Sequence, residues 1–570
     1  MSDVTRIYSG FRGCDFRGLE VNLHRSPDCL NVWKDYRKTE SICTRPGMAI
    51  EAAFDSPVYG VFFYKGEMIV HSEGKLFKIV NGEKSVLYDA SPLNYEESSS
   101  FIHNDIWYFK DGKHYLQYNG KVVTDVVGYI PTTSIARKPE GGGKVHEDVN
   151  MLSDFRKNSF LGDGEAKEFH LDARNIDEDF LPIVTKIDAV NGEVILIGGY
   201  TVDYKEGVIT FDKAPAEPAT DGQDNVFIQF KKAVPIKEET SNYRECILNC
   251  RLVQMFDNRV FFSGNPDYPN KLWHSSLNDP TYVSDDDRYD EGVDTAAVKG
   301  MVAGNNALWV FREPSDANTT VFYHNPALDV EYGKVYPSVH SSIALGCVGK
   351  AINFNDDIVF FSERGMEGIS GDVTTEQVVA HRSSMIDSKL REEPRDSYKR
   401  MVLAEWEGYL FVFFGYYAYL ADSRAVFQNE NHYEYEWFRW RLESSVTCAA
   451  VHDGELYLGT VDGVYKMTDT MADVESWWVT PVDKFGYPNM LKTTNKRGCV
   501  IEAEGDISVS VKTEDSGFEL IGTYKGVKDY FVSRIKRKKF KDIQLKFHSE
   551  TGFSLETVTL ECFIGGYIKR

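Results

Sequence analysis

Residues 534–541 hold the strongest concentration of cationic side chains in a chain whose formal net charge is −23. Clustered cations bind nucleic acid or an acidic protein surface, and lysines on a strand edge also discourage sheet-to-sheet aggregation. Only Phe531 and Phe540 stand beside these cations, so the alternating aromatics of a nucleic-acid groove are missing. Two interpretations stay open: a docking site for an acidic patch of a neighbouring copy, and a solvated strand edge. The cations are Arg534, Lys536, Arg537, Lys538, Lys539 and Lys541.

The densest acidic run is a second candidate site. Oxygen-rich loops can hold Ca²⁺, but this run lacks the spaced D-x-D-x-D-G pattern of a calcium loop. The sequence therefore predicts a solvated acidic loop and no metal. Its members are Asp285, Asp286, Asp287, Asp290, Glu291 and Asp294.

Nine scattered cysteines are not a disulfide framework and indicate folding in a reducing cytoplasm. Cys246 and Cys250 have CxxxC spacing with no second pair at zinc-finger distance, which favours buried small side chains over zinc. The histidines nearest to strand patterns are expected to be structural rather than ligands; they are His71, His103, His274 and His452.

The chain shows no GxSxG, HExxH or P-loop motif, so we expect no catalytic residue, no cofactor and no enzyme. Glycosidase chemistry needs only two carboxylates at a set distance, and nothing selects a pair among 87 acidic residues.

Candidate elements repeat along the chain. Each repeat predicts a tight hairpin. It consists of a strand with alternating apolar residues, a short turn of Asn, Asp or Gly, and a second strand rich in aromatic residues. Copies start about 40 to 50 residues apart, as blades of a β-propeller do. The sequence predicts an all-β fold with a propeller of about seven blades; two unrelated β-sandwiches are the alternative. The copies are 61–70, 101–109, 252–262, 301–311, 351–361, 402–414 and 448–458.

Four regions are expected from this pattern. Residues 1–135 form an N-terminal segment and the first blades, and 136–235 form a connector loop and an inserted small β-sandwich. Residues 236–475 supply the remaining blades, and 476–570 a C-terminal β domain or closing blades. The polar connector 137–150 is predicted to be mobile or extended, and 383–390 is the clearest helix candidate.

Composition narrows the function. Hydrophobic residues make up 42% and aromatic residues 13% of the chain, enough for β-rich cores. No apolar run approaches the roughly 20 residues of a membrane span, and the polar start lacks a signal-peptide core. The net charge of −23 disfavours binding of duplex DNA over the general surface. It permits an acidic channel wall to which passing DNA does not bind.

Several segments resemble a family of β-propeller tail and stabilisation proteins of tailed bacteriophages. The resemblance lies in the order of weak motifs along nearly the whole chain. The segments are 29–33 followed by Arg45-Pro46-Gly47, the connector at 129–133, 139–143 and 150–152, the module at 199–215, and 276–282, 479–481 and 485–488.

The resemblance implies a structural virion protein in a tail hub, nozzle or neck, assembled in the host bacterial cytoplasm. Expected partners are copies of itself in a ring, expected to be a hexamer, other tail or neck proteins, and genomic DNA passing through without sequence-specific binding. One alternative is an exterior module that binds a host glycan or receptor, with Trp437, Trp440, Trp477 and Trp478 as stacking candidates, although their close spacing favours core packing. The last alternative is a glycan-degrading enzyme.

Overall fold

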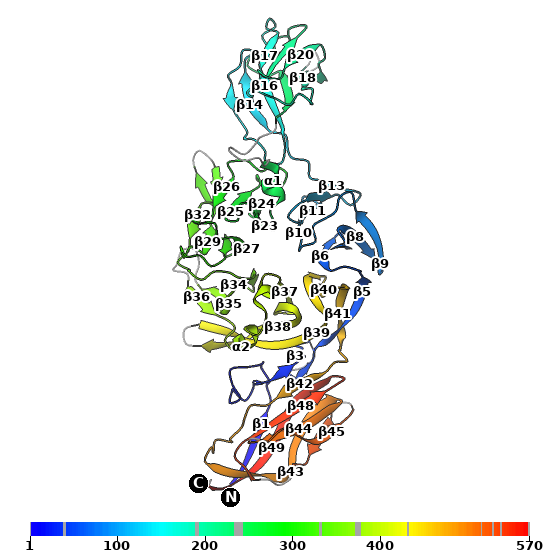
Figure 1. The fold of residues 1–570 in the computed structure, drawn as a ribbon, viewed down its shortest axis with the longest axis vertical. Coiled ribbons are helices and arrows are strands. Elements are labelled where there is room, and N and C mark those ends of the chain that lie inside the picture. The colour runs from blue at the N-terminus through cyan, green and yellow to red at the C-terminus, as the bar shows by residue number, and fades with distance from the viewer. Residues whose placement is uncertain are drawn as a thin grey trace. The chain divides into compact units, whose positions relative to one another are not determined.

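Strands dominate the computed structural model (Figure 1). It describes residues 2–37, 41–187, 193–232, 243–329, 333–370, 378–429, 432–514, 516–526, 529–535 and 539–567. The all-β prediction is confirmed: the helices in these ranges are the short α1 (Tyr243–Leu248), α2 (Asp387–Leu390) and α3 (Arg395–Tyr398). None of them has the length and apolar character that crossing a membrane requires.

The chain divides into two compact units, which we describe separately. The larger unit comprises Met1–Glu97, Gly304–Val335 and Val339–Arg570, and the smaller comprises Ser98–Ala303 and Tyr336–Ser338. The regions 1–135, 136–235, 236–475 and 476–570 stay a prediction.

Both units contain antiparallel meander sheets, by which we mean four-stranded sheets whose strands follow in chain order. In the larger unit these are β6 (Val58–Tyr64), β7 (Glu67–Ser72), β8 (Lys75–Val80) and β9 (Glu83–Tyr88), and β33 (Ala351–Phe354), β34 (Asp357–Ser362), β35 (Gly365–Ser370) and β36 (Val378–His381). In the smaller unit they are β10 (Ser99–His103), β11 (Ile106–Lys110), β12 (Tyr115–Tyr118) and β13 (Val123–Asp125), and β23 (Leu252–Phe256), β24 (Arg259–Ser263), β25 (Lys271–His274) and β26 (Arg288–Asp290).

A further four-stranded sheet has the order β27-β28-β29-β32, and β30 pairs with β31. The bounds of these strands are β27 (Val298–Gly304), β28 (Ala307–Arg312), β29 (Val321–His324), β30 (Ala327–Asp329), β31 (Gly333–Val335) and β32 (Ser338–His340).

The tight turns predicted between hairpin strands are confirmed by their backbone. Asn, Asp and Gly tolerate the positive φ that two-residue hairpin turns require. Asn104 and Asp105 have φ of 48° and 61°, and Asn305 and Asn306 have 51° and 59°. One turn was predicted a residue too late: positive φ falls on Asn355 and Asp356, and Asp357 already begins β34.

Two predicted repeats share one sheet. The strands of 402–414 and 448–458 both belong to the six-stranded sheet β37-β38-β39-β40-β41-β5, because β38 and β39 are 21 residues long and pair with each other. Its strands are β37 (Val402–Trp406), β38 (Tyr409–Asn429), β39 (His432–His452), β40 (Glu455–Thr460), β41 (Gly463–Met471) and β5 (Pro46–Ala53). The N-terminal β5 completes the sheet by pairing Ala53 with Gly463.

The two ends of the chain form what we call the terminal sandwich, where Figure 1 shows both termini. One sheet has the order β3-β4-β49-β43-β46, with β1 on β49 and β47 on β43; the other has the order β2-β42-β48-β44-β45. The strands from the N-terminal end are β1 (Ser2–Tyr8), β2 (Cys29–Leu30), β3 (Val32–Lys34) and β4 (Ile42–Thr44).

The remaining sandwich strands come from the C-terminal end: β42 (Ser476–Val479), β43 (Met490–Gly505), β44 (Ile507–Thr513), β45 (Glu519–Tyr524), β46 (Asp529–Ser533), β47 (Lys539–Phe540), β48 (Ile543–Ser549) and β49 (Phe553–Tyr567). Buried residues alternate with more exposed ones along β44 of one sheet and along most of β49 of the other, so each sheet turns one face inward.

The smaller unit also contains the module predicted at 169–230. Its sheets have the orders β15-β14-β16-β22-β18-β19 and β17-β21-β20. The bounds are β14 (Thr132–Arg137), β15 (Lys144–Val145), β16 (Phe155–Phe160), β17 (Glu168–His170), β18 (Ile183–Ile187), β19 (Val194–Leu196), β20 (Tyr200–Asp203), β21 (Val208–Phe211) and β22 (Val226–Lys231). The segment 137–150, predicted as a mobile or extended loop, includes the two-residue strand β15, which pairs with β14.

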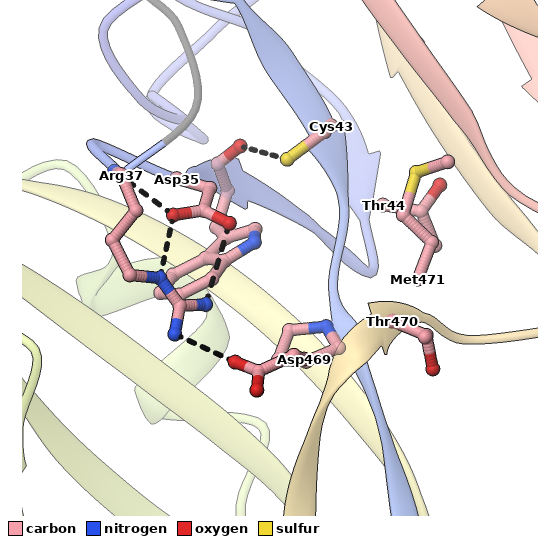
Figure 2. A pocket seen from close by; sticks show the side chains of 9 residues that line it. Asp35, Arg37, Cys43, Thr44, Asp469, Thr470 and Met471 are labelled. Atoms are coloured by element: carbon pink, nitrogen blue, oxygen red, sulfur yellow. Dashed lines mark hydrogen bonds and ion pairs between the residues drawn. The ribbon is translucent and has the colours of Figure 1, made fainter. Parts of the chain in front are cut away.

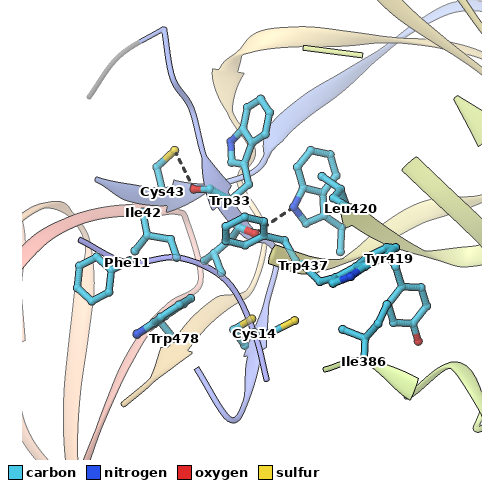
Figure 3. Close-up of a cluster of buried hydrophobic side chains, with 14 of the residues drawn as sticks. Phe11, Cys14, Trp33, Ile42, Cys43, Ile386, Tyr419, Leu420, Trp437 and Trp478 are labelled. Carbon is cyan, nitrogen blue, oxygen red and sulfur yellow. Dashed lines mark hydrogen bonds between the residues drawn. The ribbon is translucent and has the colours of Figure 1, made fainter. Parts of the chain in front are cut away.

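Aromatic side chains fill the core of the larger unit. Figure 3 shows Trp33, Trp437 and Trp478 buried in one cluster, with Ile42 beside them. Trp33 stacks on Trp406 at 5.8 Å and meets Trp440 edge-on at 5.4 Å. Because these rings come from N-terminal, central and C-terminal strands, the cluster holds together segments that are far apart in sequence.

Candidate docking surface

The predicted cationic segment lies at the end of β46 and in β47 of the terminal sandwich. Arg534, Lys539 and Lys541 are exposed, whereas Lys536, Arg537 and Lys538 lie outside the described residues. Apolar side chains alternate with these cations: Ile535 and Phe540 are buried in the sandwich core. The segment is therefore anchored by its apolar residues and presents its described cations to solvent.

Short contacts fix the backbone of this segment. Phe540 pairs with Lys492 of β43, and its ring lies 6.4 Å from that of Phe485. The buried Lys492 donates from Nζ to the carbonyl oxygens of Tyr487 at 2.5 Å and Lys541 at 2.7 Å. Burial lowers the pKa of Lys492, and the two carbonyl oxygens hold its ammonium group in place.

A hollow of about 170 Å³ lies beside the cations. Arg534 and Glu519 supply its charged lining, and Leu520 is an exposed apolar member. The remaining lining residues are Val511, Thr513, Ser516, Ile521, Ile535 and Phe540. The lining combines five apolar residues with four polar or charged ones, so the hollow suits a side chain that offers both apolar contact and a carboxylate for the guanidinium.

The strands beside the hollow are sheet edges. β45 and β46 each end the strand order of their sheet, and they are connected by the Tyr524 hydroxyl, which donates to the Val532 carbonyl at 2.9 Å. Tyr530 on β46 is 65% exposed and Leu520 on β45 is 64% exposed. Exposed edges with apolar side chains favour contact with another chain. We call Arg534, Lys539, Lys541, Leu520 and Tyr530 the docking surface.

The other predicted sites behave differently. Cys246 and Cys250 are buried in an apolar core, as predicted, and the Cys250 thiol donates to the Cys246 carbonyl at 3.1 Å. All nine cysteines are buried thiols. Burial raises the pKa of Cys250 to about 12, so this thiol is not a reactive one.

The acidic run is less solvated than predicted. Glu291 is completely buried and accepts a hydrogen bond from the Ser338 hydroxyl at 2.7 Å, while Asp290 pairs with Lys271 at 2.5 Å. Burial raises the pKa of Asp287 to about 7. Within the described ranges the carboxylates of this run do not converge as a group of metal ligands.

Three of the four candidate sugar-stacking tryptophans are core residues: Trp437, Trp440 and Trp478 are each 1% exposed. The fourth, Trp477, is partly exposed, with Lys546 Nζ 4.8 Å above its ring. Of the four predicted structural histidines, His71 and His274 are buried, and His452 stacks on Phe63 at 4.1 Å.

Figure 2 shows a small pocket beside β4 and β41. Arg37 makes a bidentate contact with Asp35 at 3.0 and 3.3 Å and donates to Asp469 at 3.0 Å. The pocket encloses about 10 Å³, which is room for about one water molecule. The Arg37 guanidinium is matched by the carboxylates of Asp35 and Asp469, so these contacts connect the segment after β3 with β41. The pocket is too small for a substrate.

Sequence reasoning missed a charged group around His381. Its Nδ1 lies 3.0 Å from Glu367 and its Nε2 lies 2.8 Å from Asp387. Burial lowers the pKa of His381, but hydrogen bonds to Asp387 and Glu367 outweigh it and raise the pKa to about 9. No spacing signal reveals the group, because β35, β36 and α2 bring the three side chains together only in the fold.

Comparisons with known proteins find fold similarity alone. No family model matches the sequence, and no curated protein matches it. The solved structure of BamB from Moraxella catarrhalis is similar at 10% identity and a TM-score of 0.32, over 74% of this chain and 96% of that one. An exo-β-1,3-galactanase from Phanerochaete chrysosporium is similar at 10% identity and a TM-score of 0.21, over 54% and 95%.

PorZ, a surface component of the type-IX secretion system of Porphyromonas gingivalis, is similar at 11% identity and a TM-score of 0.25, over 86% of this chain and 75% of that one. These similarities are too weak to assign a function. The chain is an all-β protein of repeated antiparallel sheets.

Proposed function

We propose that this chain is a structural protein of a tailed bacteriophage particle, in which copies join side by side into a ring of the tail or neck. The observation that carries the proposal is the docking surface. Arg534, Lys539 and Lys541 have no ion pair among the described residues, yet the chain around them has a net charge of −23. A second copy is therefore an electrostatically complementary partner.

The repeated sheets are the rigid part of this proposal. The five four-stranded sheets and the six-stranded sheet β37-β38-β39-β40-β41-β5 would serve as blades of a β-propeller. That is one fewer than the seven predicted, since 402–414 and 448–458 share a sheet. Stacked blades cover each other's apolar faces and give a stiff body. In a closed ring each copy contacts the next head to tail, which places a docking surface against a different acidic face of its neighbour.

The particle assignment rests on the family resemblance of the sequence. That resemblance implies a virion protein that is assembled in the host cytoplasm, with other tail or neck proteins as neighbours and DNA passing along acidic walls. The chain then has a mechanical role and no catalytic one. A glycan array that shows specific binding would favour the exterior receptor-binding alternative instead.

The test is the mass of the purified full-length protein in solution, followed by imaging for rings. We expect a closed oligomer that dissociates as salt rises, because exposed charges are screened. The triple variant Arg534→Glu, Lys539→Glu, Lys541→Glu should be monomeric at salt concentrations where the parent is a ring.

A matched control changes three exposed lysines elsewhere, Lys121→Glu, Lys144→Glu and Lys205→Glu, by the same total charge. It should assemble as the parent does. A protein that is monomeric under all conditions and absent from purified particles would refute the proposal. Equal loss of assembly in both triple variants would refute the docking surface.

A further inference from the structure

A cluster of three ligand-type side chains lies on the terminal sandwich, apart from the docking surface. One donor atom each of Glu475, His548 and Glu550 lies within 4.8 Å of the others. His548 Nε2 is 3.2 Å from Glu475 Oε1 and 3.5 Å from Glu550 Oε1. The same imidazole nitrogen thus faces both carboxylates.

Strand register places these groups on one face. Ser476 of β42 pairs with Ser549 of β48, and Trp477 pairs with His548. In an antiparallel pair, opposite residues share a face and alternate along each strand. Glu475 and Glu550, immediately beyond the last pair, therefore face each other on the side that carries His548.

Two carboxylates in this position repel, because like charges opposite each other across strands destabilise a sheet. His548 is their only ion-pair partner among the described residues. Lys546, two residues away on the same strand face, lies over the Trp477 ring instead. A cation between the three groups would turn this repulsion into attraction.

The spacing fits a divalent transition metal. Tetrahedral Zn²⁺ with bonds of about 2.0–2.1 Å has ligands about 3.3 Å apart, and the two donor distances of 3.2 and 3.5 Å lie on either side of that value. An imidazole with two carboxylates suits zinc better than magnesium or calcium, which take oxygen ligands.

We infer that Glu475, His548 and Glu550 form a site for a divalent transition-metal cation of the zinc class. The cation connects β42 with the end of β48 and keeps a fourth coordination position open. The Glu475 side of the site is already fixed to the N-terminal segment, because the Asn31 side-chain amide donates to the Glu475 carbonyl at 2.8 Å. The inference does not depend on the proposed function.

The experiment is a calorimetric titration of chelator-treated, full-length protein with Zn²⁺, repeated with Co²⁺ to record its visible absorption. We expect one site per chain in the parent. Binding should weaken at least tenfold in His548→Gln and in Glu550→Gln; Glu550 is 74% exposed, so its replacement leaves folding intact. The Co²⁺ spectrum should show a nitrogen ligand that His548→Gln removes, and Mg²⁺ should not compete.

The matched control is His146→Gln, which removes an exposed imidazole elsewhere on the chain, and it should bind as the parent does. Circular dichroism verifies that each variant is folded. Equal zinc affinity in the parent, His548→Gln and Glu550→Gln would overturn the inference, as would absence of binding in the parent.

Discussion

The meander sheet β33–β36 and the cationic segment of the terminal sandwich differ in how their charged side chains are paired. In the first, the buried Arg382 makes a bidentate contact with Asp357 at 2.8 and 3.2 Å, and the Tyr435 hydroxyl donates to the same carboxylate at 2.7 Å. In the second, Arg534 and Lys539 are exposed without ion pairs among the described residues. Buried, matched charges specify one arrangement of the chain, whereas exposed, unmatched charges are available to a partner.

The largest expected effect comes from breaking the buried pair. Arg382→Ala leaves Asp357 buried without its guanidinium, and removing one partner of a buried ion pair costs about 3–5 kcal/mol. Chemical denaturation should show this loss in the free energy of unfolding. The control Arg174→Ala removes an exposed partner of Glu206 at 3.6 Å and should cost well under about 1 kcal/mol. Similar losses of unfolding free energy in both variants would contradict the difference between buried and exposed ion pairs.

The second prediction tests whether the N-terminal strands stabilise the terminal sandwich that they form with the C-terminal strands. Ile42 is fully buried on β4 and pairs with Leu555 of β49. Ile42→Ala should lower the free energy of unfolding by about 2–5 kcal/mol through lost burial and a residual cavity. Ile7→Ala on β1, where Ile7 is 57% exposed, should cost less than about 1 kcal/mol. An unchanged free energy of unfolding in Ile42→Ala would mean that the N-terminal strands do not stabilise the sandwich.

A third effect depends on pH. Glu367 and Asp387 face His381, with Arg364 and Arg391 behind them at 3.2 and 3.8 Å from the carboxylates. The pKa of His381 is about 9 in the folded protein and near 6.5 when unfolded. Its stabilisation, up to about 3 kcal/mol, is therefore complete below about pH 6.5 and is lost as pH rises through about 9.

The measurement is the free energy of unfolding from pH 6 to 10 in the parent and in His381→Gln. The difference between the two proteins isolates His381 from other groups, such as Lys110, whose pKa burial lowers to about 8. A constant difference across this range would exclude a raised pKa of His381 in the folded protein.

The repeated sheets were predictable from sequence because their information is local. Each hairpin needs only a turn such as Asn305-Asn306 between two alternating strands, and such turns have the positive φ that asparagine tolerates. The terminal sandwich was not predictable in this way. Cys29 pairs with Trp478 and Ile42 with Leu555, and no pattern within either segment identifies the other.

The candidate sites follow the same division. The cationic segment was visible because six basic residues stand close together in an acidic chain. The hollow beside it was not, since Leu520 and Arg534 come together only after β45 and β46 have joined different sheets. The group Glu475, His548 and Glu550 was missed for the same reason: strand pairing brings together residues 73 positions apart.

The smallest expected effect is on the stability of the docking surface itself. Lys539→Ala and Lys541→Ala remove exposed ammonium groups that contact no carboxylate in the described part of the chain, so each should change the free energy of unfolding by less than about 0.5 kcal/mol. Thermal denaturation of a dilute, monomeric sample measures this without interference from assembly. Phe540→Ala, between them, removes a core ring and should cost about 3–5 kcal/mol. If the lysine variants were as unstable as Phe540→Ala, these cations would serve the fold of the sandwich, and no unmatched charge would remain for a neighbouring copy.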